Sequence, residues 1–219
     1  STRPSLENRP FVFRSGMSAE PAAPTATAAA PTAPNCRKVR RWMVLRSSSC
    51  ATSFTSVTSV AAPPVDRLAV DERPRYLRKL HWAAQLHEIG MHISHSDYHK
   101  HGAYILDNTD LPGFTMNELH RLSQLVLGHR GKLRKLESEL VEPMFVQQLM
   151  ALRLAVILCH ARRDPDTASI QLQCDVPRQI GKVTIASAWA EQWPQSAHLM
   201  REECIAWQKT GWDLQIHLA

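Results

Sequence analysis

An amphipathic helix is the strongest structural prediction that this sequence makes. Residues 75–89 carry apolar side chains at helical spacing, and these form one face: Leu77, Leu80, Ala84 and Ile89, widened by Trp82 and Leu86. Pro74 suits the first turn of a helix, and Gly90 is a typical residue at which a helix stops. The face is too apolar to remain in water, so we expect other elements to cover it.

Further helical patterns follow up to about residue 164. Residues 101–106 predict a short second helix, and Thr115 and Glu118 have the spacing of a capping box at the start of a third. Residues 145–159 are the most apolar stretch, and we expect them to form a central helix that is buried nearly all round. The predicted fold class is therefore mainly α, with a helical domain over residues 65–164.

The pattern after Pro165 changes to that of a small α+β unit. Short runs alternate apolar and polar residues, which is typical of strands, and two runs between them have helical spacing. The predicted strands cover residues 169–174, 181–186 and 211–218, and the predicted helices cover residues 187–193 and 197–208. Residues 165–219 are thus predicted to form a small α+β C-terminal domain.

Residues 1–64 differ in composition from the rest of the chain. Their tract PAAPTATAAAPTAP, at residues 21–34, has no periodicity and is typical of disorder. All eleven histidines lie from His81 onward. This break predicts a disordered N-terminal tail, a linker or a segment that is not native to the protein.

Charge and cysteine content narrow the function further. A formal net charge of +6 and a pI of about 9.3 favour anionic partners such as phosphates or other polyanions. The five cysteines include no CxxC pair, so we expect reduced thiols in a cytoplasmic protein. No apolar run approaches the length of a membrane span, and the N-terminus lacks the layout of a signal peptide.

Residues 81–114 hold six of the eleven histidines. A cluster this dense indicates metal, phosphate or proton chemistry. Within it, His87 and Glu88 lie together on the apolar run of the first predicted helix. This step resembles the His-carboxylate pair of HD-type helical domains, with Glu88 where those domains have Asp.

The stretch LHEIGMHISHSDYHKHGAYILDNTDLPGF, at residues 86–114, resembles the C-terminal region of bacterial exopolyphosphatases and guanosine-pentaphosphate phosphohydrolases. The similarity continues through LVLGHR at residues 125–130 and QLMALRLA at residues 148–155, and it covers about residues 68–219. It implies an HD-like helical domain followed by a small C-terminal domain. In that family these regions help to bind inorganic polyphosphate and to form a homodimer.

The same resemblance implies that this chain alone is catalytically incomplete. In the family, two N-terminal actin-like domains carry Gly-rich phosphate loops and release the terminal phosphate by metal-assisted hydrolysis, with Mg²⁺ in the parent enzyme. This chain has eight glycines and no Gly-rich loop before a helix. We therefore expect no cofactor to be bound by this chain itself.

The metal site of an active HD domain is also incomplete here. Such a site needs an upstream His, the His-Asp pair and a later Asp. His81 is on the same predicted helix as His87, and Val156 occupies the position of the later Asp. His87 and Glu88 are accordingly predicted to be a vestigial pair without metal, with His87 bonded to a backbone carbonyl in the core. A metal-binding pair His95-x3-His99 is the alternative for the next segment.

The candidate residues for binding a phosphate chain are basic or imidazole side chains in two segments. Distributed cations of this kind suit a flexible polyanion. Ordinary solvation and favourable charge at a helix C-terminus are the simpler explanation of the second segment. The candidates are His95, His99, Lys100, His101, His129, Arg130, Lys132, Arg134 and Lys135. We do not expect nucleic acid to be a partner.

The leading prediction is the C-terminal part of an exopolyphosphatase, which binds polyphosphate and dimerises. One alternative is a free-standing HD-type metal-dependent phosphohydrolase that acts on nucleotides. The other is a non-catalytic interaction module. The sequence does not distinguish polyphosphate from guanosine pentaphosphate as the substrate of the parent enzyme.

Overall fold

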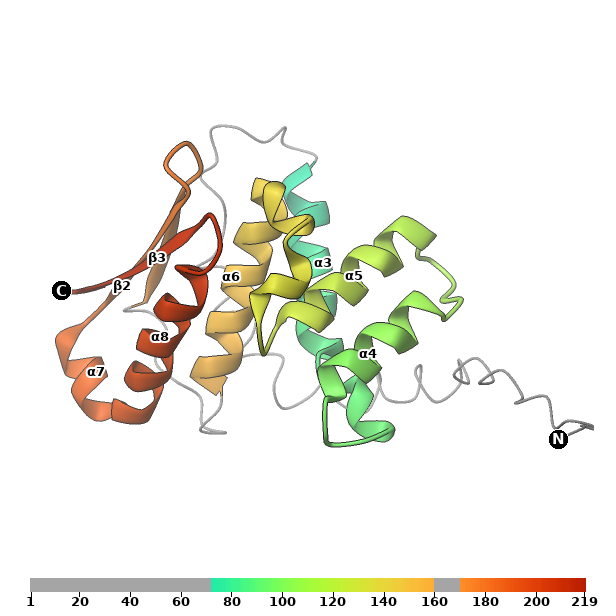
Figure 1. The fold of residues 1–219 in the computed structure, drawn as a ribbon, viewed down its shortest axis with the longest axis horizontal. Helices are drawn as coiled ribbons and strands as arrows, with labels where there is room; N and C mark the ends of the chain where they lie inside the picture. Colours follow the sequence, from blue (N-terminus) through green and yellow to red (C-terminus); the bar gives the residue numbers. More distant parts are fainter. Residues whose placement is uncertain (1–71, 160–169) are drawn as a thin grey trace, which may run out of the picture. The chain divides into compact units, whose positions relative to one another are not determined.

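The computed structural model describes residues 72–159 and 170–219 (Figure 1). The predicted tail at residues 1–64 lies outside these ranges, and so do both predicted domain boundaries, at residues 64/65 and 164/165. The described residues are mainly helical, with a small three-stranded sheet near the C-terminus. The predicted fold class is confirmed for this part of the chain. Across the same residues, no helix is long and apolar enough to cross a membrane.

The first predicted helix is present as α3, but it ends earlier than expected. It spans Glu72–Leu86, and the 3-10 helix η2 follows at Ile89–His92. Gly90 therefore lies inside η2 and does not stop α3. A Cβ atom at Gly90 would lie 1.9 Å from the Tyr98 carbonyl oxygen and 2.4 Å from the Gly102 nitrogen. Glycine is required here because two backbone segments meet, which local pattern alone does not predict.

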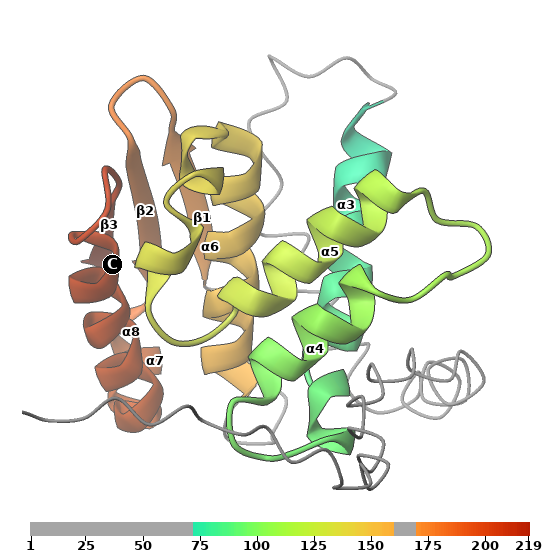
Figure 2. The same cartoon turned by 45° about the vertical axis from the view of Figure 1, so that its right-hand side comes forward.

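Helices α4 and α5 pack side by side next to α3 (Figure 2). The predicted helix at residues 101–106 is α4, which begins earlier and spans Tyr98–Asp107. Helix α5 spans Met116–Gly128 and has the predicted capping box, since Thr115 Oγ1 accepts from the Glu118 amide and the Glu118 side chain accepts from the Thr115 amide. The predicted start of this helix is confirmed. The capping box stabilises it because each residue's side chain accepts a hydrogen bond from the other's free backbone N–H.

The central helix is α6, Pro143–Leu158, and it is buried on most of its surface, as predicted. It contacts α3 and α5 as well as α8 (Figure 1). Two short 3-10 helices, η3 at Leu133–Leu136 and η4 at Glu139–Val141, connect α5 to α6. The apolar side chains of the helices and of the sheet join in one hydrophobic core.

The C-terminal segment has the predicted order of strands and helices. Strand β1, Gln171–Asp175, pairs antiparallel with β2, Ile180–Ile185, and β2 pairs in parallel with β3, Asp213–Leu218. A parallel pair needs a crossover, which is made here by α7, Ser187–Gln192, and α8, Pro194–Trp207. Proline suits the first turn of a helix, so α8 begins at Pro194, before the predicted start at residue 197. Trp212 Nε1 donates to the Leu140 carbonyl at 3.2 Å, which ties this segment to η4.

Candidate functional site

Three histidines that are far apart in the sequence meet where α3, α4 and α5 come together. His87 follows the end of α3, His99 lies in the first turn of α4, and His129 caps the C-terminus of α5. The ring centroids of His87 and His129 are 5.2 Å apart, and those of His99 and His129 are 6.3 Å apart. The Tyr98 ring completes the group at 5.5 Å from His129. We call His87, Tyr98, His99 and His129 the imidazole cluster.

His129 is the buried centre of this cluster, with a relative exposure of 2%. Its Nδ1 lies 2.6 Å from the Val126 carbonyl oxygen and its Nε2 lies 3.4 Å from the Tyr98 hydroxyl. A carbonyl only accepts, so the proton is assigned to Nδ1 and the tyrosine hydroxyl donates to Nε2. Burial, and then the neighbouring His87, hold the pKa of His129 well below its ordinary value. His129 is thus a neutral core residue and is not on the surface where a phosphate chain would lie.

His87 is also bonded to the backbone, because its Nδ1 lies 2.7 Å from the Ala84 carbonyl oxygen. This contact agrees with its interpretation as a core histidine. Its Nε2 lies 3.9 Å from the Glu88 carboxylate. Over residues 72–159 and 170–219, no three His, Cys, Asp or Glu side chains are grouped so as to hold a metal ion.

His99 differs from the other two histidines because a ring nitrogen lacks a partner. Only 7% of the residue is exposed, and its buried Nδ1 has no hydrogen bond among the described residues. A methyl group placed on Gly131 would lie 3.6 Å from His99 Nε2 and 3.8 Å from Lys135 Nζ, so these two nitrogens face the same glycine. Burial, and next the charge of Lys135, lower the pKa of His99 to about 4. The ring is neutral at physiological pH.

The charges of three basic side chains act on His99, and we call these three, Lys100, Arg130 and Lys135, the cation cluster. The Arg130 guanidinium lies 5.0 Å from the centre of the Tyr98 ring, within the range of a cation–π contact. Lys100 Nζ pairs with the Asp97 carboxylate at 2.9 Å. Burial of its ammonium end, followed by the charges of Lys100 and Arg153, lowers the pKa of Lys135 to about 8. Like charges gathered in this way repel one another, and the Asp97 carboxylate reduces that repulsion only in part.

The other predicted candidates are placed less closely together. The His95 ring is 6.3 Å from that of Tyr98, but His95 precedes the first residue of α4, so His95 and His99 do not share one helix face as the predicted metal pair requires. His101 is half-buried in α4. Lys132, just before η3, and Arg134, within η3, are exposed. The geometry therefore singles out the cation cluster within the predicted set.

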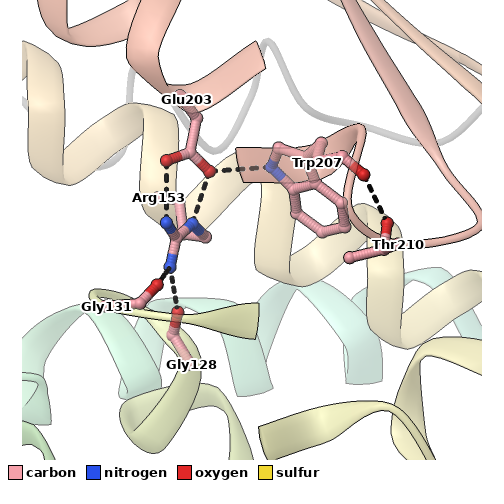
Figure 3. Close-up of polar contacts among 6 residues, drawn as sticks. All are labelled: Gly128, Gly131, Arg153, Glu203, Trp207 and Thr210. Carbon is pink, nitrogen blue, oxygen red and sulfur yellow. Dashed lines mark hydrogen bonds and ion pairs between the residues drawn. The ribbon is translucent and has the colours of Figure 1, made fainter. Parts of the chain in front are cut away.

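A buried network behind this site was not predicted. Arg153 of α6 donates to both carboxylate oxygens of Glu203 in α8, with 2.8 Å between Nη2 and Oε2 (Figure 3). Its Nη1 donates to the Gly128 carbonyl at 2.6 Å and to the Gly131 carbonyl at 3.2 Å. Trp207 Nε1 donates to Glu203 at 2.7 Å. The available signal was the arginine itself, because a charge within the most apolar helix requires a partner.

This network holds the segment that carries two members of the cation cluster. The carbonyls of Gly128 and Gly131 flank His129 and Arg130, and Lys135 follows in η3. Gly131 has a positive φ of 79°, a conformation that favours glycine and turns the chain away from α5. Arg153 therefore holds the backbone that carries Arg130 and Lys135.

Comparison with known proteins identifies similar chains. Residues 55–204 match the family described as Ppx/GppA phosphatase, domain III. A protein of Pseudoalteromonas translucida is 35% identical over 137 residues, which is 61% of this chain and 27% of that protein. A protein of Aeromonas hydrophila is 33% identical over 141 residues, 63% of this chain and 28% of that protein. Both carry the name guanosine-5'-triphosphate,3'-diphosphate pyrophosphatase. The chain thus spans little more than a quarter of the length of these relatives.

Proposed function

This chain belongs to the Ppx/GppA phosphatase family, and from that premise we propose that it binds the phosphate chain of the substrate and forms the dimer contact of a phosphoanhydride hydrolase. The proposed reaction of the whole enzyme is hydrolytic release of the terminal phosphate of inorganic polyphosphate. Catalysis and the Mg²⁺ that assists it are assigned to domains outside this chain. We also propose a cytoplasmic location.

The observation that carries this proposal is the gathering of Lys100, Arg130 and Lys135 around Tyr98 and His99. These cations come from the start of α4, the end of α5 and η3. Arginine contacts phosphate oxygens in pairs, and lysine acts as a point charge. Burial is the main cause of the lowered pKa of Lys135, and a phosphate chain along this surface would relieve the second cause, which is repulsion from Lys100 and Arg153. Lys132 and Arg134, exposed on the same segment, would extend the track.

A second candidate ligand is guanosine 5'-triphosphate 3'-diphosphate. The names of the relatives support it, because they describe pyrophosphatases of that nucleotide. It carries short phosphate groups on two positions of one ribose, whereas polyphosphate is a long and uniform chain. The cation cluster suits polyphosphate and the nucleotide alike, since both present phosphate oxygens. Binding measurements with each ligand distinguish the two.

The test is a titration of the 219-residue chain with polyphosphate and with the nucleotide at several salt concentrations. Binding that weakens with salt is expected, because each phosphate contact releases a counterion. A variant with Lys100, Arg130 and Lys135 changed to Gln should lose most of the affinity. The matched control changes Lys182, Arg201 and Lys209 to Gln, which are equally charged and exposed but lie on β2, on α8 and after α8.

Phosphate release is measured on the same samples. Release that requires His87 and a bound metal would replace this proposal with the HD-type phosphohydrolase. Absence of binding to both ligands at low salt would leave an interaction module. Light scattering after size-exclusion chromatography tests the dimer, and a single-chain mass at micromolar concentration would contradict it.

A further inference from the structure

A small hollow lies beside Gly131, in the turn that follows α5. Gly131 has a positive φ of 79°, and its lack of a side chain leaves room where another residue would have a Cβ atom. Apart from the chain neighbours of Gly131, only two heavy atoms of the described residues lie within 4 Å of that position. They are His99 Nε2 at 3.6 Å and Lys135 Nζ at 3.8 Å. We call this position the Gly131 hollow, and nitrogens from α4 and η3 line it.

His99 presents a hydrogen-bond donor to the Gly131 hollow. The residue is almost fully buried, and its enclosed Nδ1 has no hydrogen-bond partner among the residues that the structure describes. An enclosed N–H without an acceptor is rarer in proteins than an enclosed acceptor without a donor. The proton of the neutral ring is therefore assigned to Nε2, and the Nε2–H group can donate to an oxygen in the hollow.

The charges around the hollow favour an anionic oxygen. Lys135 supplies a cation at one side. The Gly131 carbonyl oxygen would repel an anion, but it accepts a hydrogen bond from Arg153 Nη1 at 3.2 Å, so a guanidinium offsets it. The Asp97 carboxylate also opposes an anion here, and it is paired with Lys100 Nζ at 2.9 Å. The hollow thus combines one neutral donor with one cation.

We propose that the Gly131 hollow is a binding subsite for a single phosphoryl group, with one non-bridging oxygen accepting from both His99 Nε2 and Lys135 Nζ. Each nitrogen lies less than about 1 Å beyond hydrogen-bond distance from the centre of the hollow, and the flexible lysine stem can close that gap. The inference rests on the proposed function, which supplies phosphate as the ligand. It adds that His99 binds phosphate as a neutral donor and that Gly131 provides the space.

The first test is an NMR titration of the 219-residue chain with inorganic phosphate at constant ionic strength, observing the ring nitrogens of the histidines. His99 should have a protonated Nε2 and an unprotonated Nδ1, and its Nε2 signal should shift as phosphate binds. The signals of His198, which is exposed on α8, should not move. The opposite tautomer of His99, or a His99 signal that phosphate does not shift, would overturn the proposal.

The second test fills the hollow with a methyl group by the substitution Gly131→Ala. The matched control is Gly113→Ala, because Gly113 also has a positive φ, of 93°, but no heavy atom lies within 4 Å of its new methyl group. Both variants carry backbone strain of the same kind. Gly131→Ala should weaken the binding of inorganic phosphate by about tenfold or more, as expected for the loss of a hydrogen bond to a charged group. Gly113→Ala should bind phosphate like the unchanged protein, and equal affinities in the two variants would contradict the subsite.

Titration with polyphosphate separates failure of the subsite from failure of the proposed function. If the unchanged chain binds polyphosphate and Gly131→Ala binds it equally well, the subsite is refuted and the proposed function stands. If inorganic phosphate shifts the His99 signal but polyphosphate does not bind, the subsite stands and the proposed function is refuted.

Discussion

Arg153 and Glu203 form a buried ion pair between α6 and α8, with side-chain exposures of only 6% and 7%. The pair is bidentate, and the remaining donors of Arg153 reach the Gly128 and Gly131 carbonyls (Figure 3). The Arg153 guanidinium thus connects α8, the helix that precedes β3, to the end of α5. The network joins the packing of the C-terminal segment to the position of the cation cluster.

Glu203→Gln should destabilise the protein by about 3–5 kcal/mol, because Arg153 would remain buried without its counter-charge. Urea unfolding measures this change. The control is Glu142→Gln, which breaks the bidentate pair between Arg121 and Glu142, where the Glu142 side chain is 49% exposed. Solvent screens that pair, so a loss of at most about 1 kcal/mol is expected. Equal losses in the two variants would show that burial of Arg153 is not what makes its pair important.

Gly90→Ala should cost about 3 kcal/mol or more, since a methyl group would collide with the backbone of Tyr98 and Gly102. Backbone atoms cannot turn aside as a side chain can, so α4 would have to move away from η2. The Gly211→Ala variant is the control, because the nearest atom to its new methyl group is 3.6 Å away. Thermal unfolding of both variants tests the prediction. It fails if the Gly90→Ala and Gly211→Ala variants have the same melting temperature.

The triple change of Lys100, Arg130 and Lys135 to Gln should flatten the salt dependence of polyphosphate binding. Three lost phosphate contacts are expected to reduce the slope of log affinity against log salt by about 2, by the rule that holds for single strands. Fluorescence anisotropy with labelled polyphosphate measures the slope. An unchanged slope would place the binding surface elsewhere, whatever the loss in affinity.

Acid should destabilise the protein between about pH 6.5 and pH 4. In the folded protein the pKa of His99 is about 4. The pKa of His129 also lies well below that of a histidine in the unfolded chain. In this pH range the unfolded chain therefore binds more protons than the folded chain. As a result, the free energy of unfolding falls as the pH drops through this window. The slope is at most about 1.4 kcal/mol per pH unit for each histidine.

Unfolding by urea at successive pH values measures this effect. His99→Phe keeps a ring at the site but cannot be protonated, so its stability should depend less on pH. His198→Gln, at an exposed position on α8, should behave like the unchanged protein. An identical pH dependence in the His99→Phe variant would rule out His99 as a source of the acid sensitivity.

Local chemistry made several features predictable from the sequence. The capping box of Thr115 and Glu118 defines the start of α5 because both partners lie within one turn of the chain. The apolar stretch that became α6 was recognisable as a buried helix, because only Gln147, Gln148 and Arg153 interrupt its apolar residues. Alternation predicted the three strands for the same reason, since side chains of a strand point to opposite faces in turn.

The errors arose where distant segments meet. Gly90 was expected to end a helix, whereas its lack of a side chain serves the close approach of Tyr98 and Gly102. His129 was expected to contact phosphate, but it is buried against Val126 and Tyr98. Neither contact leaves a periodic signal in the sequence, because each depends on which helices pack together.

The sequence by itself determined the helices, the strands and the family pattern, because these follow from periodicity, capping and residue type over short distances. Tertiary structure alone decided that three histidines form one cluster and that Arg153 pairs with Glu203. It also selected Lys100, Arg130 and Lys135 from a longer set of basic residues. The physical reason is that burial and the mutual influence of charges depend on separation in space, which separation along the chain does not specify.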